Sequence, residues 1–265
     1  PTKGPVPVHM VYLPGRAELF RDAGQIARHA LEFYSKLCAP YAFPQLTLQD
    51  GPSSGMEYPM VINSNRGAAD HETGHQWWPM MVGNNETWYG WMDEGFNQYM
   101  NILSDADYDK QPAVHDGEGQ KYGRTSGDEW EAPMMWNANW AGPMYGYQTY
   151  SKTPLMLSML GGIVGDSAVQ KAQSAYTHAW AFKHPSPWDY MFFMSNQLQQ
   201  ELGWFWYYWL FTTERVDGSI QSVTKTGTRT TVRVRQDGQM PSPVVLRVEF
   251  EPAGAPIRMM PNAKA

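Results

Sequence analysis

Two histidines and a glutamate in this chain have the residue types and the spacing of a metal site. The stretch H-E-T-G-H places His71 and His75 four residues apart, and Glu94 follows His75 after 18 intervening residues. On a helix, residues four apart project from one face, so both imidazoles can bind one ion. A catalytic zinc site adds one further protein ligand and keeps one position open. The pattern therefore predicts one Zn²⁺ per chain, bound by His71, His75 and Glu94.

Glu72 is the candidate general base. On the predicted helix it lies roughly 100° around from His71, close enough to reach a water at the metal without becoming a ligand. It would take the proton of that water during attack on a scissile carbonyl and pass it to the leaving amine. The same motif arises by chance, and a buried histidine is more often a hydrogen-bonded core residue than a ligand. The second acidic helix at a suitable distance favours the metal site.

The surrounding sequence predicts the elements that must hold these residues. The metal-binding residues are expected on two helices, residues 66–81 and 92–104. Upstream, apolar periodicity predicts a helix over residues 16–38. Alternating patterns then predict strands over residues 45–49 and 56–62.

Downstream of the predicted metal site, the chain is expected to be mainly helical. Residues 105–140 are acidic and rich in Gly, Pro and Trp without a steady period, so they are expected to form an irregular rim of the substrate cleft. Helices are expected to follow over residues 147–160, 167–182 and 188–202. The aromatic stretch at residues 204–211 has eight residues, far short of the roughly 20 that span a bilayer. It predicts a short packed helix, and no transmembrane segment is expected.

The C-terminal residues have a different pattern. Residues 219–224, 230–235 and 244–250 alternate and are rich in Val, Thr and Arg, with turn signals between them. These features predict a small antiparallel β unit over residues 219–265, after a mainly helical domain over residues 1–218. The expected fold class is therefore α+β.

The composition argues against nucleic acid as a partner and excludes a disulfide within the chain. The chain has 265 residues, a formal net charge of -6 and a pI near 5.6, which argue against nucleic acid as a partner. Cys38 is the only cysteine, so no intrachain disulfide can form. Its place among apolar helical residues predicts an inert core thiol.

Three motifs, in order, resemble the M1 family of zinc aminopeptidases, the gluzincin group with a thermolysin-like catalytic domain. The first is the H-E-x-x-H stretch with the E-G-F that begins at Glu94. The second is G-M-E-Y-P from Gly55, which resembles the family's G-x-M-E-N, and the third is Y-S-K-T from Tyr150, which resembles Y-x-K-G. Order and spacing match from about residue 20 to about residue 220. The resemblance implies a hydrolase, a thermolysin-like domain over residues 1–218 and a partial β-sandwich over residues 219–265.

The resemblance also implies roles for four further residues. Tyr150 would donate a hydrogen bond to the oxyanion of the tetrahedral intermediate. Glu57 would bind the free α-amino group of a peptide, with Gly55 and Met56 in the same substrate-binding strand. Gly55 would let the backbone approach the substrate closely. The chain departs from the family pattern at three positions, which puts its specificity in doubt: Tyr58 stands for Asn, Asp93 for Asn and Thr153 for Gly.

Peptides with a free N-terminus are the expected partners of such an aminopeptidase. The family's N-terminal β domain and C-terminal helical domain are not in this stretch, so these domains or another chain are expected to cover the site. The chain opens without a signal-peptide pattern and looks internal or processed, which leaves both a periplasmic or secreted and a cytoplasmic location open. The alternatives are an endopeptidase, an epoxide hydrolase and a catalytically silent structural or interaction subunit. The presence of all five chemical residues argues against the silent domain.

Overall fold

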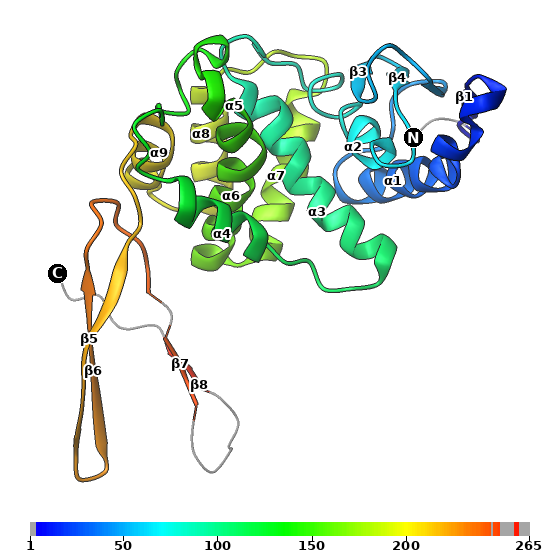
Figure 1. The fold of residues 1–265 in the computed structure, drawn as a ribbon. Coiled ribbons are helices and arrows are strands. Elements are labelled where there is room, and N and C mark those ends of the chain that lie inside the picture. Colours follow the sequence, from blue (N-terminus) through cyan, green and yellow to red (C-terminus); the bar gives the residue numbers. More distant parts are fainter. Residues whose placement is uncertain (1–3, 245, 250–256, 260–265) are drawn as a thin grey trace. The chain divides into compact units, whose positions relative to one another are not determined.

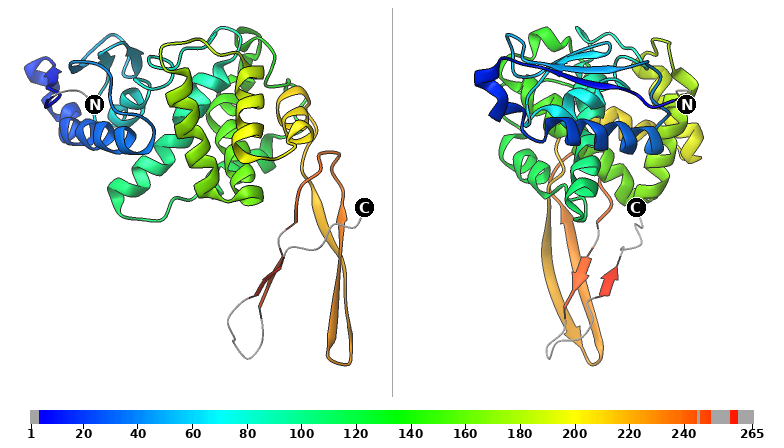
Figure 2. Two further views of the ribbon diagram at one scale, coloured as in Figure 1. Left: turned by 180° about the vertical axis from the view of Figure 1, so that it is seen from behind. Right: turned by 90° about the vertical axis from the view of Figure 1, so that its right-hand side faces the viewer.

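The computed structural model describes residues 4–244, 246–249 and 257–259. The chain forms two compact units, Pro1–Thr212 and Thr213–Ala265. Within the first unit, a small sheet lies with helices α1 and α2 at one end, and helices α5 to α9 gather at the other (Figure 1). Helix α3 runs between the two groups, and the rear view shows the same order (Figure 2). In the first unit, α3 therefore lies between the sheet with α1 and α2 on one side and the group α5 to α9 on the other.

The sheet of the first unit has the strand order β1-β2-β4-β3. Strands β1 (Val8–Val11), β2 (Leu46–Gln49) and β4 (Val61–Asn63) are parallel, and β3 (Met56–Tyr58) pairs antiparallel with β4. The strand predicted over residues 56–62 is wrong, because Pro59 and Met60 form a turn inside it and Met60 has a φ of 66°. Proline is favoured at the second position of such turns and a positive φ occurs at the third. In the strand order β3 comes last and pairs only with β4, so it is an edge strand of this sheet.

The first predicted helix is interrupted. A 3₁₀ helix spans Pro14–Phe20, and α1 begins only at Ala23 and ends at Leu37. Between them, Asp22 has a left-handed φ of 62°, which breaks the helical path. Helix α1 packs against α2 and α3 through its buried side, and the Cys38 thiol that follows it is buried and unpaired.

The helix that carries the two histidines is shorter than predicted. Helix α2 spans Ala69–Gly74, so His75 lies at its C-terminal cap. The prediction of a helix to residue 81 fails because Pro79 has no N–H to donate to the His75 carbonyl and disfavours helical geometry at Trp78. Helix α3 spans Phe96–Asp109 and follows directly on a π-helical turn over Trp91–Gly95.

The remaining helices of the first unit largely follow the predicted pattern. The expected irregular segment over residues 105–140 is partly wrong, because α3 continues to Asp109 and α4 spans Asp116–Thr125. No helix of the described residues is long and apolar enough to cross a membrane. The other helical elements are the 3₁₀ turns Ala138–Trp140 and Gly142–Met144, α5 (Tyr145–Tyr147), a π-helical turn (Gln148–Lys152), α6 (Thr153–Val164), α7 (Asp166–Trp180), α8 (Pro187–Leu198) and α9 (Gly203–Phe211).

The second unit consists of short antiparallel pairs. Strands β5 (Gly218–Thr226) and β6 (Arg229–Gln236) form one hairpin, and β7 (Leu246–Val248) pairs with β8 (Ile257–Met259). The predicted strand over residues 244–250 lies partly outside the described residues, which exclude 245 and 250. The α+β class predicted from the sequence is confirmed, while the β-sandwich stays a prediction.

Candidate metal centre

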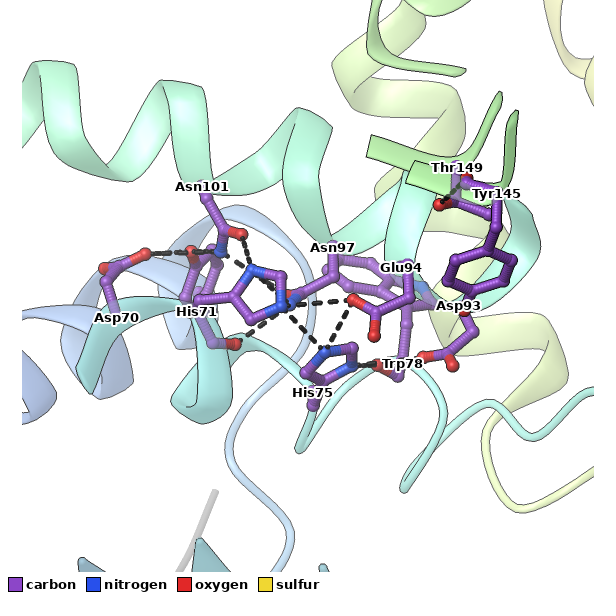
Figure 3. A network of polar contacts seen from close by, with 11 residues as sticks. Asp70, His71, His75, Trp78, Asp93, Glu94, Asn97, Asn101, Tyr145 and Thr149 are labelled. Carbon is purple, nitrogen blue, oxygen red and sulfur yellow. Dashed lines mark hydrogen bonds and ion pairs between the residues drawn. The ribbon is translucent and has the colours of Figure 1, made fainter. Parts of the chain in front are cut away.

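Three side chains from two elements converge on one point of the first unit. Helix α2 supplies His71, its C-terminal cap is His75, and the π-helical turn Trp91–Gly95 supplies Glu94 (Figure 3). The Glu94 Oε2 atom lies 3.1 Å from His71 Nε2 and 3.2 Å from His75 Nε2, and the two Nε2 atoms are 3.1 Å apart. Three ligands of a tetrahedral zinc ion, each at roughly 2.0–2.1 Å from the metal, lie roughly 3.3 Å from one another. The donor atoms therefore form a triangle of the size that Zn²⁺ requires.

Contacts behind the histidines orient both rings. The Nδ1 atom of His71 lies 2.7 Å from the Asn101 side-chain oxygen, and the Nδ1 atom of His75 lies 2.7 Å from the Trp78 carbonyl oxygen. Both partners are acceptors, which assigns a proton to each Nδ1 and leaves each Nε2 lone pair for a metal. Asn101 is itself held by Tyr34 at 2.8 Å, within a buried group that includes Asp70. The imidazoles are thus positioned before any ion binds.

The charges of this group suit a divalent cation. Burial alone would raise the pKa of Glu94, but hydrogen bonds from His71 and His75 outweigh it and hold this pKa well below its ordinary value. Burial opposes protonation of His75, yet its contacts with Asp93 and Glu94 raise the His75 pKa well above its usual value. In the metal-free chain, protonated Nε2 atoms of His71 and His75 can donate hydrogen bonds to the Glu94 carboxylate. A metal ion would displace those protons, as is usual for histidine sites.

Glu72 lies beside this triangle without joining it. Its side chain is buried, and its Oε2 atom has no hydrogen-bond partner among the described residues. Burial raises the Glu72 pKa to about 7, close to the value suited to a proton acceptor at neutral pH. Gly55 makes room for this carboxylate, since a Cβ atom at Gly55 would lie 2.7 Å from Glu72 Oε1. Gly55 therefore has a steric role toward Glu72, in addition to the predicted approach of substrate.

Tyr150 reaches the same point from a second π-helical turn. That turn, Gln148–Lys152, packs against the turn that carries Glu94. Burial, followed by the charge of Glu94 and a hydrogen bond to it, raises the Tyr150 pKa well above its ordinary value, so the hydroxyl stays a donor. The turn that carries Glu94 also lies tightly against the start of α6, because a Cβ atom at Gly95 would lie 2.5 Å from the Thr153 Cβ. Single π-helical turns are frequent at functional sites, and here two of them each carry one site residue.

Glu57 approaches the group from edge strand β3. Its side chain is buried, and its carboxylate lies within 4.8 Å of donor atoms of Glu72 and His75. Burial raises the pKa of Glu57, and the nearby carboxylates Asp93 and Glu94 add to this effect. Met56, the preceding residue, is exposed, because successive side chains of a strand point to opposite faces.

The structure adds neighbours that the sequence motifs did not indicate. Glu86 joins Glu57 and Asp93 in a group whose carboxylate oxygens lie within 4.8 Å of one another. Tyr145 faces the same carboxylates, and burial followed by their charges raises its pKa to about 12. Glu86 stands in the loop between the two predicted helices, where no spacing rule marks it. Tyr145 precedes Tyr150 by five residues in a segment that also contains Tyr147, and no motif distinguishes it there.

No family model and no curated protein matches the sequence. Solved structures do match the fold. An M1 zinc metallopeptidase from Deinococcus radiodurans aligns with a TM-score of 0.59 at 18% identity, over 72% of this chain and 44% of that one. A two-domain M1 zinc metallopeptidase variant bound to L-tryptophan aligns with a TM-score of 0.63 at 19% identity, over 78% and 49%. Native yeast LTA4 hydrolase aligns with a TM-score of 0.61 at 17% identity, over 79% and 38%.

These similarities define the fold of the chain. At such identities the chain has an M1-like, zinc-peptidase-like fold, as the sequence motifs predicted. The chain spans less than half the length of each of these three proteins.

Proposed function

We propose that this chain is a zinc metallopeptidase that releases N-terminal residues from peptides. The observation that carries the proposal is the triangle of His71, His75 and Glu94 donor atoms, 3.1–3.2 Å apart, with the partnerless Glu72 carboxylate beside it. A structural zinc site would have no use for a buried, unpaired carboxylate next to a three-ligand set. The M1-like fold supports the same reading.

Each remaining group of the site has a role in peptide hydrolysis. When bound by His71, His75 and Glu94, Zn²⁺ supplies an electrophile that polarises a carbonyl and lowers the pKa of a water. Glu72 takes the proton of the attacking water and returns it to the leaving amine. The Tyr150 hydroxyl, protonated at all ordinary pH values, donates to the oxyanion that develops on the substrate.

Binding of a free N-terminus follows from strand β3 and the carboxylates around it. The outer edge of β3 is not paired within the sheet of the described residues, so it can pair with an extended peptide. Glu57 on this strand, with Glu86 and Asp93 close by, gathers three carboxylates at one end of the site. No Lys or Arg among the described residues forms an ion pair with these three carboxylates. A substrate ammonium group would neutralise this end of the site.

The first test measures the metal and the turnover together. Purified chain should contain about one zinc per molecule by elemental analysis and should hydrolyse an aminoacyl-coumarin. His75→Ala should lose both properties, because one edge of the donor triangle disappears. Zinc-free protein that cannot be reconstituted would exclude the metal site, and zinc-loaded protein without turnover would leave the silent domain as the better reading.

The second test separates an aminopeptidase from an endopeptidase. The ratio of kcat/KM for a free peptide to that for its N-acetylated form should be high in the wild type and should fall in Glu57→Ala, with zinc retained. Glu18→Ala, which removes an exposed carboxylate remote in sequence, is the matched control and should keep the ratio. A wild-type ratio near one would support an endopeptidase. A high ratio that Glu57→Ala does not change would place the amine elsewhere.

A further inference from the structure

A hollow of about 400 Å³ opens beside the candidate metal centre. His71 and Tyr150 form its border with the site. Ala68 lines it from the start of helix α2, and helix α3 contributes Gln98, Asn101 and Asp105. The hollow therefore adjoins the donor triangle, but none of the roles proposed above uses it.

The order of residues along the site places the hollow on the leaving side of the scissile bond. The Glu57 carboxylate lies near His75, with Glu86 and Asp93 beyond it. At the other end, a Cβ atom at Gly55 would lie 3.8 Å from the Ala68 Cβ, so the start of β3 adjoins the hollow. A peptide whose ammonium binds at the Glu57 end has its first carbonyl at the donor triangle. Its second residue must then extend toward His71, Ala68 and the hollow.

The hollow carries one carboxylate whose charge is not balanced. The buried Asp70 accepts hydrogen bonds from Tyr34 and Ser104 at 2.6 Å each, so its oxygens are satisfied internally. Asp105 is exposed on α3 and makes no ion pair or side-chain hydrogen bond among the described residues. Arg66, next in the chain to the hollow residue Gly67, forms its ion pair with Asp22 instead.

The electrostatic setting of Asp105 agrees with this geometry. Although the residue is exposed by surface area, partial desolvation of its carboxylate, followed by the negative charges of Asp70 and Asp109, raises the Asp105 pKa to about 6. At neutral pH the Asp70 and Asp109 carboxylates repel the Asp105 carboxylate, while His29 and His71 attract it. A cation placed in the hollow would relieve that repulsion.

On the basis of the aminopeptidase function proposed above, we propose that this hollow receives the side chain of the substrate's second residue, and that Asp105 favours a lysine or arginine there. Tyr150 and His71 at the border keep the scissile bond next to this side chain. Asp105 is thus a specificity-determining residue that acts by binding substrate and takes no part in proton transfer.

The test measures binding, so that it does not depend on turnover. The full chain, zinc-loaded and carrying Glu72→Gln, is titrated by calorimetry with two tripeptides that differ only in lysine or norleucine at the second position. We expect the lysine peptide to bind about 1.5- to fivefold more tightly, the range of an exposed charge pair. Asp105→Asn should remove this preference. Asp109→Asn, which removes the same charge from the same helix outside the hollow, should retain it.

The outcomes distinguish this inference from the proposed function. Equal binding of the two peptides, binding of neither, or equal effects of Asp105→Asn and Asp109→Asn would overturn the assignment of the hollow. A lysine preference that depends on Asp105 would support it, even if the wild-type chain hydrolysed no peptide. In that case the peptidase proposal would fail and the binding site would stand.

Discussion

The buried ion pair behind Tyr150 offers a stringent test of how the site is held in place. Lys152 Nζ lies 2.7 Å from Glu131 Oε1, and the two side chains are 0% and 1% exposed. The second Glu131 oxygen accepts the Gly127 N–H at 2.7 Å, and the Gln148 side chain donates to the Ala132 carbonyl. These contacts fasten the turn that carries Tyr150 to residues 127–132.

Removal of one partner should be far more damaging than removal of both. Lys152→Met leaves the Glu131 carboxylate buried without its cation, and such changes destabilise proteins by about 3–5 kcal/mol. The double variant Lys152→Met/Glu131→Leu buries no unpaired charge. It should recover most of that loss and lie within about 1–2 kcal/mol of the wild type, since the Gly127 N–H also loses its acceptor. As a control, Lys121→Met breaks an exposed pair with Glu118 and should change stability by less than about 1 kcal/mol.

Tryptophan fluorescence during urea unfolding can measure these stability differences for the first unit of the chain alone. All 12 tryptophans lie within Pro1–Thr212, so the second unit does not contribute to the signal. The midpoint and slope of the transition give the free energy of unfolding for each variant. A Lys152→Met loss as small as that of Lys121→Met would refute the buried pair. A double variant no more stable than Lys152→Met would show that the loss does not come from an unpaired charge.

Three further predictions concern the residues around the metal centre. Glu72→Gln should retain stoichiometric zinc by elemental analysis and lose turnover by about 10²–10⁴-fold, because an amide cannot accept the proton of water; substantial residual kcat would move the general base elsewhere. Tyr150→Phe should lower kcat by about 10²–10³-fold with little change in KM, because an oxyanion donor acts in the transition state. An unchanged kcat would direct attention to Tyr145. The pKa of Asp105 in the folded state is raised to about 6, above its ordinary value of about 4. Protonation of Asp105 therefore stabilises the fold fully below about pH 4, and this contribution to the free energy of unfolding is lost as the pH rises through about 6. Urea unfolding at pH 8 should therefore find Asp105→Asn more stable than the wild type, and the difference should be smaller at pH 4. A larger difference at pH 4 than at pH 8 would contradict the raised pKa.

The candidate donor set could be predicted from the sequence, because the pattern that indicates it is local. His71 and His75 share a face through the fixed geometry of one helical turn, and even the shortened helix α2 holds them together. Two misplaced boundaries also had local signals, the turn at Pro59 and the end of α2 before Pro79.

The residues that surround the donor set from distant segments could not be predicted from the sequence. The approach of Glu86 to Glu57, the Lys152–Glu131 pair and the hollow beside Asp105 each join segments that share no helical or strand register. Their meeting depends on how α3, β3 and the two π-helical turns pack, which is the sum of many contacts spread over the first unit. Residues within one turn are placed by backbone hydrogen bonds of fixed geometry, whereas residues on separate elements are placed by side-chain packing that no short spacing encodes.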